Sequence, residues 1–118
     1  MKEFPRFSAC LFLAIAPALT CAAGQVSNEP IAYTDVTQLQ STGPHVFFVV
    51  FNVTVSGAPP PCATQTMRFV ADLNTPGGQG MMAAILAAQM AGRNVSIMGR
   101  GSCDIWSDTE SMAYVNVY

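Results

Sequence analysis

The strongest constraint on the fold is the segment His45–Val55, which reads HVFFVVFNVTV. Valine and phenylalanine favour extended backbone, so the segment predicts a β-strand. Its odd-numbered positions from Phe47 onward form one apolar face, and Val46, Phe48 and Val50 make most of the opposite face apolar as well. A strand that is apolar on both faces has to be covered on both sides. We expect the domain's own core to cover one face and a second subunit to contact the other, at Val46, Phe48 and Val50.

The first 23 residues have the pattern of a cleavable secretory signal. Two basic residues precede an apolar run from Ala9 to Leu19, and small residues precede Gly24. The run is too short to cross a bilayer, which needs about 20 apolar residues. We therefore expect cleavage before Gly24, leaving residues 24–118 as a single secreted or periplasmic domain with no transmembrane segment. A lipoprotein anchor on Cys21 is the alternative interpretation.

Cleavage would leave two cysteines, Cys62 and Cys103. An even pair of cysteines in an exported domain indicates a disulfide, because the thiols meet an oxidising environment. Two cysteines and the single His45 are too few ligands for a metal site. We expect neither a metal ion nor a cofactor.

The charge of residues 24–118 limits the class of partner. This part of the chain carries six carboxylates, three arginines and no lysine, which gives a formal charge of −3. Nucleic-acid binding depends on Lys and Arg contacts to phosphates, so we expect no nucleic-acid partner. The same shortage disfavours a polybasic membrane-binding surface.

The remaining elements follow from local patterns. Thr75 is a candidate N-cap with Pro76 at the first helical position, and Gly92 is a candidate stop. Residues 24–30 are polar, and we expect them to be loose, without regular secondary structure. We expect Ser56–Pro61 to be a stiff loop that cannot continue a β-ladder, because proline donates no backbone hydrogen bond. The other predicted strands are Ile31–Gln38, Thr66–Asp72, Asn94–Gly99 and Met112–Tyr118.

The resulting order, β-β-β-α-β-β, is that of a β-rich α+β protein. It predicts a five-stranded OB-like barrel with one helix and one disulfide, in which the helix plugs an end of the barrel. A split α+β sandwich with the helix on one sheet face is the alternative.

The most distinctive chemistry lies between Cys103 and Ser111. Trp106 stands beside Ser107, Asp108 and Glu110, and an indole flanked by polar groups could stack on a sugar while those groups bind its hydroxyls. The alternative is a tryptophan that caps the core beside the disulfide.

An enzyme is the weaker interpretation of the same stretch. No serine or cysteine nucleophile has an evident base, since His45 begins a buried strand. Asp108 and Glu110 could act as the acid and base of a glycosidase, but a solvated acidic loop beside a turn is the stronger interpretation of them. We expect a non-enzymatic protein.

The segment from Cys62 through the helix to Cys103-Asp-Ile-Trp106 resembles a class of short secreted bacterial OB-fold proteins, the receptor-binding B subunits of AB5 toxins. The resemblance rests on the secretory signal, the single disulfide, a helix before the last two strands and a cysteine then a tryptophan entering the final strand. It implies a ring-forming glycan binder, with Trp106 in the ligand site. We therefore expect a homo-oligomeric binding protein with a glycan ligand. A structural or inhibitory protein that binds another protein is the alternative.

Overall fold

The computed structural model of the chain describes residues 23–39 and 45–118. The predicted signal, except for Ala23, lies outside the described residues. The described part forms one helix and seven strands: β1 (Gly24–Pro30), β2 (Tyr33–Leu39), β3 (His45–Phe51), β4 (Ser56–Gly57), β5 (Arg68–Asp72), α2 (Pro76–Ala91), β6 (Asn94–Gly99) and β7 (Glu110–Val117). No helix among the described residues is long and apolar enough to cross a membrane.

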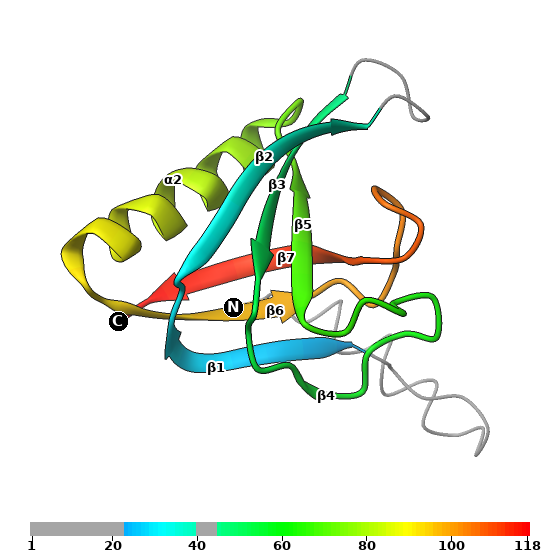
Figure 1. Cartoon of the computed structure of the whole chain (residues 1–118), viewed down its shortest axis with the longest axis horizontal. Coiled ribbons are helices and arrows are strands. Elements are labelled where there is room, and N and C mark those ends of the chain that lie inside the picture. The colour runs from blue at the N-terminus through cyan, green and yellow to red at the C-terminus, as the bar shows by residue number, and fades with distance from the viewer. Residues whose placement is uncertain (1–22, 40–44) are drawn as a thin grey trace, which may run out of the picture.

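The seven strands form one mixed sheet in the order β2-β3-β5-β7-β6-β1-β4. All neighbours are antiparallel except β5 and β7, which pair in parallel through Glu110 and Ser111 at the start of β7. From Met112 onward β7 pairs instead with β6. Strand β7 therefore joins two halves of the sheet that run in different directions (Figure 1).

The predicted five-stranded barrel is wrong, although the β-rich class, the helix and its place in the chain are confirmed. The sheet order ends at β2 on one side and β4 on the other, so the sheet is not closed. Residues 24–30, expected to be loose, form strand β1 between β6 and β4. Their polar sequence concealed the strand, because β1 is stabilised by its backbone pairing and buries few apolar side chains.

Helix α2 begins and ends where the sequence predicts. The side chain of Thr75 accepts a hydrogen bond from the Gly78 amide at 3.0 Å, with Pro76 in the first turn. At the other end Gly92 has a φ of +66°, the left-handed conformation typical of a helix C-terminus. Gly78 is required for packing, because a Cβ there would lie 1.9 Å from the backbone oxygen of Asp72.

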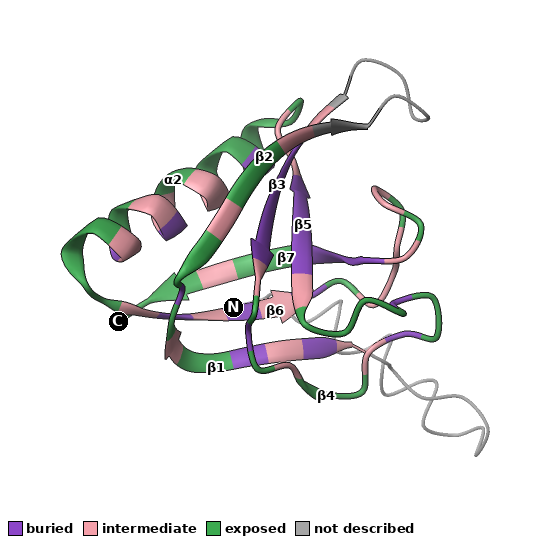
Figure 2. Ribbon diagram, in the orientation of Figure 1, coloured by how far each residue is buried: buried purple, intermediate pink, exposed green. Residues whose placement is uncertain are grey.

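Strand β3 is covered on both faces by the chain itself. Phe48 and Val50 are 1% and 0% exposed and pack in the main core with Ile85 of α2. On the other face Phe47 and Val49 form a smaller cluster with Val70. Ile105 and Trp106, in the loop before β7, cover that smaller cluster. Figure 2 shows β3 as mostly buried.

The second subunit expected at Val46, Phe48 and Val50 is therefore not needed to cover β3. Val46 is half-buried, and the other two side chains are inaccessible. Strand β3 also ends at Phe51, earlier than predicted, because Asn52 adopts a φ of +56°. Asparagine is one of the few residues that tolerate this left-handed conformation.

Candidate functional site

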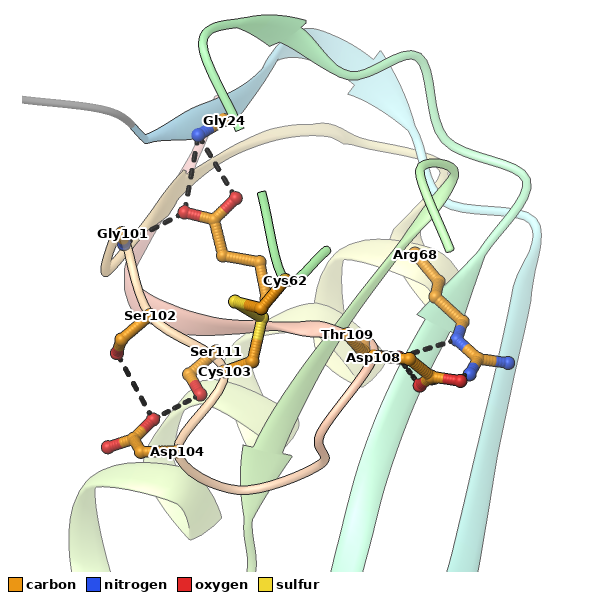
Figure 3. Close-up of a disulfide and its surroundings, with 11 residues drawn as sticks. Gly24, Cys62, Arg68, Gly101, Ser102, Cys103, Asp104, Asp108, Thr109 and Ser111 are labelled. Atoms are coloured by element: carbon orange, nitrogen blue, oxygen red, sulfur yellow. Dashed lines mark hydrogen bonds and ion pairs between the residues drawn. A yellow bond between two sulfur atoms is a disulfide. The ribbon is translucent and has the colours of Figure 1, made fainter. Parts of the chain in front are cut away.

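The predicted disulfide between Cys62 and Cys103 is confirmed. Their Cα atoms lie 6.2 Å apart across 41 positions of sequence. The bond joins the loop before β5 to the loop between β6 and β7 (Figure 3). A second link, from the Gln65 amide to the Asp108 carbonyl at 3.0 Å, joins the same two loops. These loops therefore form one tethered surface next to the ends of β3 and β5.

Arg68, at the start of β5, organises this surface. Its Nε donates to the Thr109 hydroxyl at 2.8 Å, and a terminal guanidinium nitrogen lies 3.0 Å from an Asp108 carboxylate oxygen. The guanidinium carbon lies 4.1 Å from the centre of the Trp106 ring, a cation–π contact. Thr109 also donates its hydroxyl proton to Asp108 at 2.9 Å. The orientation of the guanidinium group is therefore fixed by three neighbouring side chains.

Trp106 contributes to packing as well as to this cluster. It is half-buried against Phe47, Val49 and Val70. A turn of four residues from Trp106 to Thr109, closed by a 3.1 Å backbone bond, holds the indole in place. The indole is thus not a free platform, because the Arg68 guanidinium lies over its ring.

A second polar cluster surrounds Asp104. Its carboxylate accepts from the hydroxyls of Ser111 at 2.6 Å and Ser102 at 3.3 Å, and pairs with Arg100 at 2.9 Å. The hydrogen bond from Ser111 is the main cause that lowers the pKa of Asp104, and Arg100 adds to it. These contacts fix the loop that carries Cys103.

Glu110 lies in a different environment. Its side chain is 2% exposed, and its carboxylate accepts backbone hydrogen bonds from Gly24 and Gly101. Burial raises the pKa of this carboxyl, while the two amides act in the opposite direction. In Figure 3, Gly24 and Gly101 lie on the opposite side of the view from Arg68 and Asp108.

The predicted ligand residues therefore do not form one site. The structure brings Trp106 and Asp108 together through Arg68, and it leaves Ser107 exposed beside them. Glu110 is buried away from this cluster. Asp108 and Glu110 bind different elements, so they do not flank a common space as a glycosidase pair would.

Sequence reasoning missed Arg68 and the pocket beside it. The pocket has a volume of about 330 Å³. Its lining combines amide, hydroxyl and guanidinium groups with two apolar side chains: Phe51, Asn52, Thr64, Gln65, Thr66, Met67 and Arg68. The sequence did contain one indication of this site, because Arg68 is the single cationic residue within the predicted strand Thr66–Asp72.

Among the described residues, no group of three His, Cys, Asp or Glu side chains could hold a metal ion. Comparison with protein-family models gives no match, and searches of curated proteins and of solved structures give no significant match.

Proposed function

We propose that this chain is an exported, non-enzymatic binding protein that recognises a glycan beside Arg68. The observation that carries the proposal is the fixed guanidinium of Arg68, which stands at the edge of a polar pocket. A guanidinium is a planar set of five donors, and its immobilisation reduces the entropy lost when it binds a ligand oxygen. Trp106 then acts as a positioning residue for Arg68.

The lining of the pocket suits a sugar. Asn52, Thr64 and Gln65 are exposed and offer both donors and acceptors to ligand hydroxyls. Phe51 and Met67 add apolar surface for the C–H face of a sugar ring. The volume lies within the range of small-ligand sites.

The acidic residues support a binding role over a hydrolytic one. Asp108 is occupied by Arg68 and Thr109, and Glu110 is buried against backbone amides. Export is part of the proposal because a disulfide is typical of proteins in oxidising compartments.

A glycan array probed with the purified protein tests the proposal. We expect binding to a defined set of glycans, and at least tenfold weaker binding for Gln65→Ala and Arg68→Lys. Lysine keeps the charge but loses the planar fork of donors. Arg93→Lys, the same substitution at an exposed arginine outside this pocket, is the matched control and should bind as the parent does. An array without signal would refute the proposal, and so would equal binding by the folded pocket variants.

The second candidate is self-association through β2, which would give the expected homo-oligomer. Strand β2 ends the sheet order, and its side chains Tyr33 and Val36 are 57% and 52% exposed. An antiparallel edge strand can pair with the same strand of a second copy across a two-fold axis. Asp35 restrains this pairing, because its carboxylate accepts the Val36 amide proton at 2.8 Å.

Light scattering tests this candidate. We expect a dimer at micromolar concentration that dissociates on Val36→Lys, because a lysine on an edge strand opposes pairing. A monomeric parent protein would dismiss self-association and leave the glycan proposal unaffected.

A further inference from the structure

Glu110 is a buried carboxylate that no described cation neutralises. Two of the three arginines in the described part of the chain pair with other carboxylates, Arg68 with Asp108 and Arg100 with Asp104. The remaining arginine there, Arg93, donates to the backbone oxygen of Tyr118. A buried carboxylate without a positive partner is costly unless hydrogen bonds compensate for its burial.

The carboxylate lies in a cradle built from glycines. The Gly24 nitrogen lies 3.0 Å from Oε1 and 3.2 Å from Oε2, and the Gly101 nitrogen lies 2.9 Å from Oε2. A Cβ on Gly99 would lie 2.0 Å from Oε2, and one on Gly24 would lie 2.8 Å from Oε1. These positions leave no room for side chains, so the backbone closes directly around the carboxylate.

Gly24 is also the residue before which the sequence predicts cleavage of the signal. We propose that cleavage places the new α-ammonium of Gly24 on the buried Glu110 carboxylate, and that this ion pair stabilises the mature fold. The inference rests on the predicted cleavage position and does not depend on the proposed glycan site.

The chemistry of this step balances without a cofactor. A signal peptidase adds one water across the Ala23–Gly24 peptide bond, and the carbon–nitrogen bond breaks. Ala23 leaves with the signal as a carboxylate, and the Gly24 nitrogen becomes an amine that is protonated near neutral pH. One amide donor next to Glu110 thus becomes three donors with a positive charge.

The rest of β1 can remain in place after cleavage. One backbone bond is lost, from the Ala58 amide to the Ala23 carbonyl at 3.1 Å. Ala58 is exposed, so its amide can bind water instead. The pairing of Gly24 with Gly57 and of Gln25 with Ser56 does not involve Ala23.

No other titratable side chain contacts the proposed pair among the described residues. Gly24, Gly99 and Gly101 surround the carboxylate and have none. On the adjoining segments, Arg100 and Asp104 bind one another, and Asp108 binds Arg68. A change in the reactivity of the amine therefore reports on Glu110.

The test uses the full-length chain exported by its own signal. Intact mass and N-terminal sequencing of the product give the cleavage position, expected before Gly24. Labelling of the N-terminal amine with an acylating reagent near pH 7.5 gives the fraction of free amine. We expect at least tenfold slower labelling than in the same chain unfolded in urea, because each unit of raised amine pKa removes tenfold of the free base.

Two variants separate the ion pair from burial alone. Glu110→Gln keeps an acceptor for the amine but removes the charge, so labelling should become at least tenfold faster. Asp104→Asn alters a carboxylate in the same region that binds Arg100, and its labelling rate should match the parent's. If Glu110→Gln does not fold, the labelling rate of the parent protein against pH gives the amine pKa directly, and this pKa must be raised above about 8. Cleavage elsewhere, an amine pKa near 8 or an unchanged rate in folded Glu110→Gln would each overturn the proposal.

Discussion

Replacing Phe48 by alanine tests whether this residue belongs to the core of the domain or to a subunit interface. Phe48 is 1% exposed and lies in the main core, with Val50 and Ile85 in the same cluster. Removing a buried phenylalanine ring costs about 3–5 kcal/mol, through lost transfer free energy and the cavity that remains. Val36 is opposite Phe48 in the register of β2 and β3, but it is 52% exposed. Val36→Ala is therefore a matched control that should cost less than about 1 kcal/mol.

Urea unfolding of the full chain, followed by circular dichroism, measures this difference. With an m-value of about 1.3 kcal/mol/M, Phe48→Ala should lower the unfolding midpoint by about 2–4 M. If that variant does not fold, Phe48→Leu should still lower the midpoint measurably, because the side chain is enclosed. The reasoning is refuted if Phe48→Ala costs no more than Val36→Ala while light scattering shows a smaller oligomer. That result would indicate that Phe48 lies in a subunit interface, as the sequence analysis expected, and not in the core.

Four further perturbations have expected outcomes of known sign. Replacing Cys62 and Cys103 together by alanine should lower the free energy of unfolding by about 4 kcal/mol in the chain-entropy model, measured by urea unfolding. Gly78→Ala should destabilise α2, because its Cβ would lie 1.9 Å from a backbone oxygen. Gly80→Ala, with nothing within 4 Å of its Cβ, should raise the melting temperature by stabilising the helix by up to about 1 kcal/mol. In the uncleaved chain the raised pKa of Glu110 means that the folded state binds more protons than the unfolded state. Stability should therefore fall as pH rises from about 4.5 through the folded pKa, and Glu110→Gln should remove this slope in urea unfolding at several pH values.

The helix was predictable because its two ends depend on local capping residues. The disulfide was predictable because a pair of cysteines in an exported domain is expected to be oxidised. The ends of α2 follow from the hydroxyl of Thr75 and from the freedom of Gly92 to adopt positive φ. Strand β6 matches its predicted bounds, Asn94–Gly99, since its alternating burial repeats the alternation of its side chains. These signals act over a few residues and need no knowledge of distant neighbours.

Strand β1 was not predictable in the same way. It has one large buried apolar side chain, Val26, and it is held by backbone bonds to β6 and β4. Backbone hydrogen bonds do not depend on the side chain, so they leave little trace in a polar sequence. The open sheet was missed for the same reason. Without β1 the sequence predicted five strands, which is the number in an OB barrel.

The candidate site shows the same division. The sequence identified the polar stretch from Cys103 to Ser111 as chemically distinctive, but neighbours in sequence were expected to act together. In the fold Asp108 binds Arg68 on β5, whereas Glu110 binds Gly24 on β1. Asp108 lies in the turn from Trp106 to Thr109, whereas Glu110 is the first residue of β7, so strand alternation does not relate the two side chains. The bend at this turn directs them toward different elements.

The amino-acid order alone thus specified a small β-rich chain with one capped helix and one disulfide, because propensity, capping and cysteine pairing depend on residue type. The tertiary structure decided which surfaces cover β3, where Arg68 stands and which group faces Glu110. Those outcomes depend on contacts between residues tens of positions apart, such as Arg68 with Asp108 and Gly24 with Glu110. Packing selects such contacts from many that a sequence pattern permits, so they become visible only in the folded chain.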